Sequence, residues 1–139
     1  MVSLYVPPVQ SAVEGSRQAT LKNFATTLNY LREQYQQAPT VVYADLNARC
    51  RSCDEQKCTP QDAEVMRLVT SYQLQLVYDD TPSSYTWSNC LHRSYLDFFL
   101  VRGATHENFA VTEKIGSSDH RAIELTITGA QPQILRRTT

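Results

Sequence analysis

Hydrophobic positions along the chain switch between helical and strand-like spacing, which predicts a mixed α/β domain. From about Arg17 to Tyr35, apolar residues recur at helical spacing, at positions 21, 24, 25, 28, 31 and 35, and Ala38-Pro39 ends this predicted helix. A second helix is predicted to start at Thr59-Pro60. The reason is that a hydroxyl N-cap, a proline at the first helical position and an acid in the first turn follow one another there.

Strand-like segments surround these two helices. Residues 2–6 are short and apolar and end at Pro7-Pro8, whereas residues 40–44 are apolar throughout, as in a strand covered on both faces. Further strands are predicted at residues 74–77, 84–87, 95–101, 109–115 and 122–127. The order β-α-β-α followed by four or five strands predicts a layered α+β domain, with two main helices against a mostly antiparallel sheet. Residues 46–58 are expected to form a polar loop and residues 129–139 an extended tail.

Composition narrows the class of protein. The 139 residues fit one domain, and a hydrophobic content of 42% is too high for disorder. Thirteen Lys and Arg against fourteen Asp and Glu exclude a strongly basic body held to nucleic acid by charge alone. The sequence contains no stretch of the roughly 18 apolar residues of a membrane span, and it starts with neither a signal peptide nor an Arg-rich transit peptide. We therefore expect an intracellular, reducing compartment (nucleus, cytosol or organelle matrix) rather than secretion.

The four cysteines allow two interpretations. Cys50, Cys53 and Cys58 follow the pattern Cys-x2-Cys-x4-Cys, and Cys90 lies near His92. A zinc site built from the first three thiolates and either Cys90 or His92 is one interpretation. The other is a set of free thiols in a reducing compartment, or one redox-sensitive pair in a loop.

Polar residues interrupt apolar segments at two places. Asp45 follows directly on the apolar residues 40–44, with Asn47 two residues on, and this pair indicates either a turn or a functional site. Asp97 lies inside an apolar run, on the predicted face of Tyr95 and Phe99. An unpaired Asp at such a position would cost several kcal/mol or stay protonated, so we expect a His or metal partner, or backbone donors.

A third polar group, Ser118-Asp119-His120, precedes the last predicted strand. If these three places converge, the site holds what phosphodiester hydrolysis needs. That is a base or orienting group for water, a cation near the phosphate oxygens, and carboxylates for a divalent metal. The residues concerned are Asp45, Asn47, Asp97, Asp119 and His120.

Four segments, in this order, resemble motifs of the endonuclease/exonuclease/phosphatase superfamily, in the style of apurinic endonucleases and the endonuclease domains of non-LTR retrotransposons. Tyr5-Val6-Pro7-Pro8 resembles the family's Tyr-x-Pro, and Ala44-Asp45-Leu46-Asn47-Ala48 resembles its Gly-Asp-Phe/Leu-Asn-Ala. The other two are Thr86-Trp87-Ser88-Asn89 followed by Tyr95-Leu96-Asp97-Phe98-Phe99-Leu100-Val101, and Ser117-Ser118-Asp119-His120-Arg121-Ala122-Ile123. The resemblance covers about residues 2–128. Ala44 stands in place of the family's Gly and Tyr95 in place of its Arg.

The resemblance implies a role for five catalytic residues. Asp45 would orient or deprotonate the attacking water, and Asn47 would contact the scissile phosphate. His120, paired with Asp97, would stabilise charge on the phosphate oxygens, and Tyr5 would contact the phosphate from the opposite wall.

Three further residues receive supporting roles from the resemblance. Asp119 would lie on the metal side as a vestigial Mg²⁺ ligand, and Thr86 and Ser118 would contact the substrate phosphate through their hydroxyls.

The same resemblance implies that residues 1–128 are the C-terminal half of a four-layer α/β-sandwich nuclease fold. The family's N-terminal half, with an early Asn and the metal-binding Glu, has no counterpart in this sequence. Because Mg²⁺ needs near-octahedral oxygen ligation, we expect the isolated chain to be non-catalytic. It would act as an interaction or structural subunit docked in a larger assembly, with another protein chain covering its exposed sheet face. The alternative is a Mg²⁺-dependent, retrotransposon-type endonuclease completed by a separate N-terminal half, which alone would make nucleic acid a partner. A zinc module unrelated to nucleases leaves the four-part match unexplained.

Overall fold

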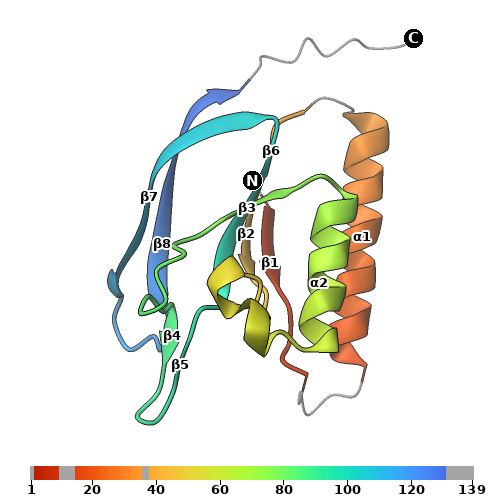
Figure 1. Cartoon of the computed structure of the whole chain (residues 1–139). Helices are drawn as coiled ribbons and strands as arrows, with labels where there is room; N and C mark the ends of the chain where they lie inside the picture. Colours follow the sequence, from red (N-terminus) through yellow and green to blue (C-terminus); the bar gives the residue numbers. More distant parts are fainter. Residues whose placement is uncertain (1, 10–14, 36–37, 131–139) are drawn as a thin grey trace, which may run out of the picture.

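The fold is built on a four-stranded sheet at the centre of the molecule (Figure 1). The computed structural model describes residues 2–9, 15–35 and 38–130. The strand order is β1 (Val2–Tyr5), β2 (Thr40–Asp45), β6 (Asp97–Arg102) and β3 (Gln75–Val77). β1 runs parallel to β2, whereas the β2–β6 and β3–β6 pairs are antiparallel. The predicted layered α/β fold with a mostly antiparallel sheet is therefore confirmed.

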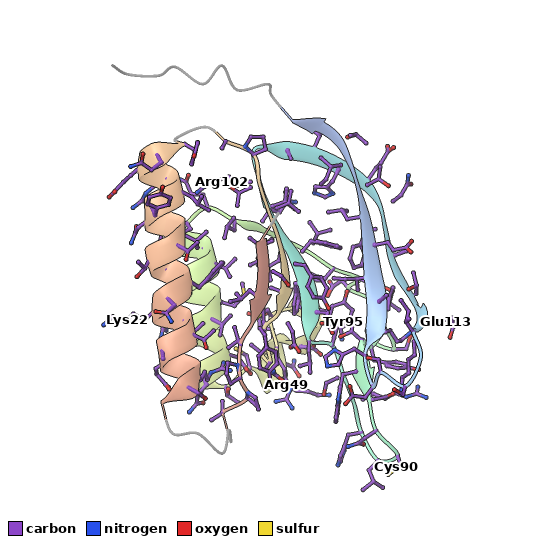
Figure 2. All side chains as sticks on the ribbon, turned by 180° about the vertical axis from the view of Figure 1, so that it is seen from behind. Lys22, Arg49, Cys90, Tyr95, Arg102 and Glu113 are labelled. Carbon is purple, nitrogen blue, oxygen red and sulfur yellow. The ribbon has the colours of Figure 1, made fainter. Side chains whose placement is uncertain are left out.

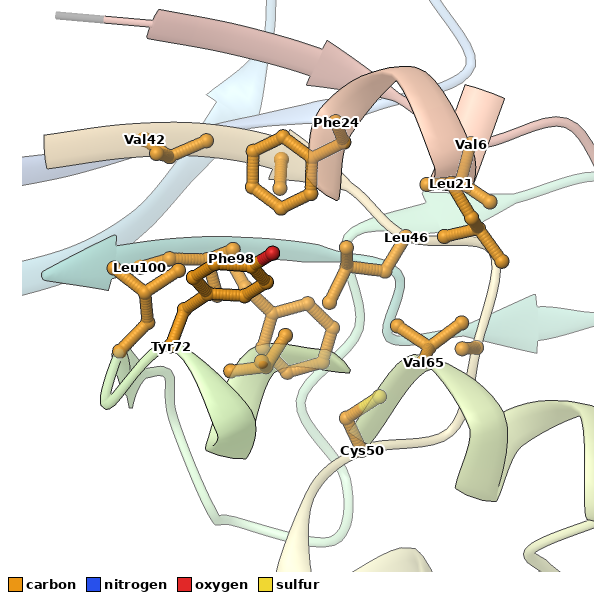
Figure 3. Close-up of a cluster of buried hydrophobic side chains, with 14 of the residues drawn as sticks. Val6, Leu21, Phe24, Val42, Leu46, Cys50, Val65, Tyr72, Phe98 and Leu100 are labelled. Atoms are coloured by element: carbon orange, nitrogen blue, oxygen red, sulfur yellow. The ribbon is translucent and has the colours of Figure 1, made fainter. Parts of the chain in front are cut away.

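Two helices, α1 (Ser16–Gln34) and α2 (Pro60–Ser71), lie side by side on one face of this sheet (Figure 1). α2 begins as predicted, since the Thr59 hydroxyl accepts a hydrogen bond from the Asp62 N–H and the Asp62 carboxylate accepts one from the Thr59 N–H. The main core fills the space between helices and sheet (Figure 3). Its largest fully buried side chain is Phe98, and its members include Val6, Leu21, Phe24, Leu28, Val42, Leu46, Val65, Val69 and Leu100.

An antiparallel ribbon of β7 (Ala104–Lys114) and β8 (Arg121–Ala130) lies on the other side of the sheet (Figure 1). Phe99 packs toward this ribbon and Phe98 toward the helices, because successive strand residues face opposite sides. Tyr95 corrects one expectation. It does not share the face of Phe99; it packs on Phe98, with ring centroids 5.4 Å apart. The chain enters β6 only at Asp97, so strand alternation does not extend back to Tyr95.

A short hairpin of β4 (Trp87–Ser88) and β5 (Arg93–Ser94) projects beyond the sheet, and Cys90 lies at its tip (Figure 2). The sequence pattern did not indicate β5, nor the 3-10 helix η1 (Ser52–Lys57) inside the expected polar loop. β7 also begins five residues earlier than predicted. These elements have largely exposed, polar side chains, and such elements show no apolar period.

Two further expectations concern the end of the chain and the membrane. β8 runs to Ala130, so the expected start of the tail at residue 129 lies inside a strand, while residues 131–139 lie outside the described residues. In the described part of the chain, no helix has both the length and the apolar character that a membrane crossing requires.

Candidate active site

Three neighbouring strands bring the predicted site residues to one edge of the central sheet. The parallel register of β1 and β2 places Tyr5 beside Asp45, and the antiparallel register of β2 and β6 places Asp45 opposite Asp97. The sequence separates these residues by up to 92 positions, so only strand pairing brings them together. His120, just before β8, completes the group.

Asp97 and His120 form the hydrogen-bonded pair that the resemblance implied. His120 Nδ1 lies 2.8 Å from Asp97 Oδ2, and the Tyr43 hydroxyl donates to Asp97 Oδ1 over 2.8 Å. The Asp97 side chain is completely buried, so these two partners satisfy a carboxylate that would otherwise be costly in the interior. Burial, followed by the charge of Asp97, raises the pKa of Tyr43, which therefore stays protonated as a donor. The predicted pairing of Asp97 with His120 is confirmed.

Backbone hydrogen bonds hold the segment around His120 against β4. The Ser88 N–H donates to the Asp119 carbonyl over 3.2 Å, and the Arg121 N–H donates to the Thr86 carbonyl over 2.7 Å. The backbone on either side of His120 is therefore held in place by these two hydrogen bonds. Its imidazole position follows from a strand-like bridge to Trp87 rather than from a flexible loop.

Thr86 does not occupy the place expected of a phosphate ligand. Its side chain is fully buried, and its hydroxyl accepts hydrogen bonds from the Leu96 N–H (2.9 Å) and the Asp97 N–H (3.2 Å). Thr86 therefore positions the backbone that carries Asp97 and cannot reach a substrate in the open pocket. The exposed Ser118 hydroxyl accepts a hydrogen bond from the His120 N–H over 3.1 Å, and its contact with phosphate stays a prediction.

Asp45 faces the second nitrogen of the imidazole. Asp45 Oδ2 lies 3.7 Å from His120 Nε2, and Asp45 Oδ1 accepts a hydrogen bond from the Asn47 N–H over 3.2 Å. Asn47 takes a left-handed conformation (φ 44°), which Asn tolerates better than most residues, and its amide donates to the Val6 carbonyl over 2.7 Å. A continuous line of polar side chains therefore runs from Asp97 through His120 to Asp45.

Burial and nearby charges change the pKa values of two of these three side chains. Burial, reinforced by the charge of Asp97, raises the pKa of Asp45 to about 6. Partial burial alone would lower the pKa of His120. The hydrogen bond and charge of Asp97, with the charges of Asp45 and Asp119, outweigh that effect and raise the pKa. An Asp with a pKa near 6 is a better proton acceptor than an ordinary carboxylate and is still mostly ionised at neutral pH.

This line of polar side chains ends at a surface pocket of about 440 Å³. Five of the predicted site residues line it: Tyr5, Asp45, Asn47, Asp119 and His120. The Asp119 side chain is 64% exposed, and its Oδ2 accepts a hydrogen bond from the indole N–H of Trp87 over 2.9 Å. Tyr5, 59% exposed, is free to contact a molecule bound in the pocket.

The residues present fit a magnesium ion poorly by themselves. One ligand atom from each of Asp45, Asp97 and His120 lies within 4.8 Å of the others. However, Asp97 is fully buried with each carboxylate oxygen already in a hydrogen bond, and imidazole is not a ligand that Mg²⁺ prefers. Among the described residues this leaves the carboxylates of Asp45 and Asp119, too few for an octahedral oxygen shell. The three-residue group is therefore better described as a hydrogen-bonded Asp97–His120 pair with Asp45 at ion-pair distance than as a metal site.

The expected zinc ligands are not brought together. Among the described residues, no three of the four cysteine sulfurs lie within 4.8 Å of one another. Cys50 points into the main core (Figure 3), whereas Cys53, Cys58 and Cys90 are exposed. Burial, together with the charge of Asp62, raises the pKa of the Cys50 thiol to about 12, which disfavours the thiolate that zinc requires.

Two residues of the site were not assigned a role from the sequence. Tyr43 orients Asp97, and the indole of Trp87 orients Asp119. Tyr43 had a readable signal, because it lies two residues before Asp45 and therefore on the same face of β2. Trp87 had no such signal, since its contact depends on where the segment before β8 packs.

Comparison with known proteins gives the family and the fold. The family model described as "Endonuclease-reverse transcriptase" matches residues 1–124. Among solved structures, the chain is similar to the endonuclease domain of TRAS1, a telomere-specific non-LTR retrotransposon, at 15% identity and a TM-score of 0.62. That match covers 88% of this chain and 54% of the TRAS1 chain, so this chain spans about half the length of the solved domain. No curated protein matches the sequence. The family match over most of the sequence, together with the shared fold, shows that this chain belongs to the endonuclease–reverse transcriptase family, within the endonuclease/exonuclease/phosphatase type.

Proposed function

We propose that this chain carries the proton-transfer half of a metal-dependent site that cleaves phosphodiesters in nucleic acid. The observation that supports the proposal is the chain of contacts from Asp97 through His120 to Asp45, which ends in an open pocket. A purely structural domain has no need for a buried Asp97 that holds a partly exposed His120 at the edge of a pocket. The further metal ligands would come from a segment outside this chain.

The residues present can carry out two of the tasks that hydrolysis needs. Asp45 accepts a proton from a water molecule in the pocket, so that the water oxygen can add to phosphorus as one P–O ester bond breaks. The leaving ester oxygen keeps the electron pair of that bond and takes a proton from solvent. His120, held by Asp97, presents Nε2 to the pocket and stabilises negative charge on a non-bridging oxygen. A bound Mg²⁺ would supply further charge neutralisation, and the described residues alone do not complete its ligand shell.

Plasmid nicking tests this function. We expect the isolated chain to nick supercoiled DNA slowly, and only at Mg²⁺ or Mn²⁺ concentrations well above the physiological range, because its carboxylates hold the metal weakly. His120→Gln should abolish this nicking, since it removes the group that stabilises phosphate charge. The exchange His106→Gln on β7, outside the pocket, should leave it unchanged and serves as the matched control.

The outcome separates the two functions that the sequence suggested. Nicking that requires metal and His120 supports the catalytic proposal. A chain that leaves the plasmid supercoiled at every metal concentration, in a preparation whose folding is verified by circular dichroism, contradicts catalysis by this chain alone and favours the non-catalytic interaction subunit.

A separate observation favours an additional role for a partner segment. An open apolar groove of about 380 Å³ runs between the central sheet and β8. Its apolar lining comprises Val41, Tyr43, Phe99, Ile123, Leu125 and Ile127. The β7–β8 ribbon already packs on Phe99 of the central sheet, yet the groove leaves part of this apolar face open, and Ile127 is 40% exposed. We infer that the other half of such an endonuclease domain, in the same or a separate polypeptide, packs into this groove.

Sedimentation equilibrium tests this inference. Without its partner, the chain is expected to self-associate as its concentration rises, because the apolar groove avoids water. Ile127→Glu should reduce the association, since it places a charge in the groove. Ile115→Glu introduces the same charge at a 74% exposed position outside the groove and should have little effect. A chain that is monomeric at all concentrations, with a cooperative thermal transition, would contradict the need for a partner.

A further inference from the structure

A second pocket, of about 340 Å³, lies next to the candidate active site and carries the opposite charge. It is formed by the chain around η1, residues 82–85 and the β5 strand. We propose that this basic pocket binds a backbone phosphodiester of the same polynucleotide strand, a short distance from the phosphate that is cleaved. The inference rests on the proposed function and adds to it a subsite that holds the substrate.

The first argument is charge. The chain as a whole has a net charge of −1, yet this one pocket is lined by four cationic side chains and a single carboxylate, Asp54. The cations are Arg49, Arg51, Lys57 and Arg93. Within the described residues, Arg51 is the only Lys or Arg with a carboxylate closer than 4.0 Å. The charges of the other three are therefore uncompensated by protein groups, as expected where an anion binds.

The second argument is preorganisation. Arg51 is 95% buried; its guanidinium pairs with Asp54 at 2.9 Å, donates to the carbonyls of Asp79 and Thr81, and stacks on Tyr95. It forms a rigid base for the pocket. Arg93 lies 4.4 Å from the centre of the Tyr85 ring, which restrains an otherwise exposed guanidinium. The Arg49 guanidinium donates to the Lys57 carbonyl over 3.0 Å and so remains near the pocket wall. Cations held in place lose less conformational entropy on binding than free surface side chains do.

The third argument is position. Ser94 lines both pockets, and its neighbours Tyr95 and Leu96 line one pocket each. One short stretch of chain therefore separates the two pockets. Phosphates along one DNA strand of a duplex follow each other with a rise of about 3.4 Å. A DNA strand that crosses residues 94–96 therefore places phosphates in both pockets. The candidate active site is rich in carboxylates, and a neighbouring cationic subsite offsets their repulsion of the substrate.

DNA binding without divalent metal tests the subsite independently of cleavage. The full chain is titrated into a fluorescein-labelled DNA duplex in EDTA, and fluorescence anisotropy is followed at several NaCl concentrations. The double variant Arg49→Gln, Lys57→Gln is expected to bind about tenfold more weakly, equally for duplexes of different sequence. The slope of log K against log salt should fall by about 1 for each lost phosphate contact.

The matched control removes the same charge elsewhere. Lys22→Gln, Arg67→Gln changes two exposed cations on α1 and α2, and neither residue lines the pocket (Lys22 and Arg49 are marked in Figure 2). We expect this variant to change the dissociation constant less than twofold. Equal losses in the two double variants would overturn the proposal, because binding would then follow net charge and not the pocket. Wild-type affinity and salt slope in Arg49→Gln, Lys57→Gln would overturn it as well.

A competition experiment separates a polynucleotide from a small anion. Inorganic phosphate, added at constant ionic strength, should compete weakly, because it makes one contact where a strand makes several. Complete displacement of DNA at a phosphate concentration near that of the protein would identify a small-anion site and overturn the proposal. Because the binding assay contains EDTA and measures no cleavage, a failure of cleavage and a failure of the subsite give different results.

Discussion

Asp97→Asn is expected to slow DNA nicking by about 10³- to 10⁴-fold while changing the fold little, because the amide has the same shape but no charge. In the wild type the carboxylate accepts hydrogen bonds from both Tyr43 and His120. An amide can accept at one atom only and must present its N–H₂ at the other. The imidazole then loses the partner that fixes its tautomer, and the protonated ring loses its buried counter-charge.

A measurement that does not depend on cleavage distinguishes this role from mere packing. The titration of His120, followed by NMR of the imidazole, should show a lower pKa in Asp97→Asn than in the wild type, since Asp97 raises the wild-type value. Glu107→Gln, which neutralises an exposed carboxylate on β7, should change neither the nicking rate nor this pKa. An unchanged His120 pKa in Asp97→Asn would contradict the proposed pairing in solution.

Asp45→Asn is expected to lose cleavage activity and to gain stability at the same time. The loss, about 10²- to 10⁴-fold, follows because an amide cannot accept the proton of the attacking water. The gain follows from the pKa of Asp45, which burial raises from its ordinary value of about 4 to about 6. Between these values the native state binds more protons than the unfolded state. The free energy of unfolding of the wild type therefore decreases as pH rises through this interval.

Urea denaturation at a series of pH values measures the effect. Below about pH 4, where Asp45 is protonated in both states, the variant and the wild type should be similarly stable. As pH rises to about 6, the variant should become more stable than the wild type by about 1–3 kcal/mol. Most of this interval lies below the titration of His120, whose raised pKa keeps the imidazole charged there. A variant that is equally or less stable across the whole interval would show that burial of Asp45 is not costly.

The loss of activity and the gain of stability expected for Asp45→Asn have the same physical cause. The carboxylate of Asp45 is kept in an environment that disfavours its charge, which costs stability and increases its affinity for a proton. The protonated imidazole of His120, 3.7 Å from Asp45, limits that cost, whereas the charge of Asp97 adds to it. Site and stability are therefore coupled through the same three side chains.

Much of this could be predicted from local sequence. The apolar period of residues 17–35 predicted α1, the hydroxyl, proline and acid at residues 59–62 predicted the start of α2, and the uniformly apolar residues 40–44 predicted β2. These signals are local, since each depends on neighbours within one or two turns of the chain. The site residues were also predicted, because an acid inside an apolar strand such as Asp97 needs a partner wherever the strand packs.

Other features were decided by tertiary contacts. Thr86 looked like a phosphate ligand, but its hydroxyl is buried by the backbone of residues 96 and 97. The cysteine spacing suggested zinc, but Cys50 turns into the core while its neighbours stay exposed. The basic pocket was not predicted for the same reason, since Arg93 joins the cations of residues 49–57 from 36 positions further along the sequence, and the chain as a whole is close to neutral.

The sequence by itself determined the family, the two helices and the residue types of the candidate site, because these depend on residue types at short spacing. Only the tertiary structure decided which of those residues touch. Strand register set Asp45 opposite Asp97, and the bridge from Trp87 to His120 brought the imidazole to both. The packing of η1 near β5 collected the cations beside them. Contacts between distant segments depend on how whole layers pack, and the local spacing of apolar residues does not specify that packing.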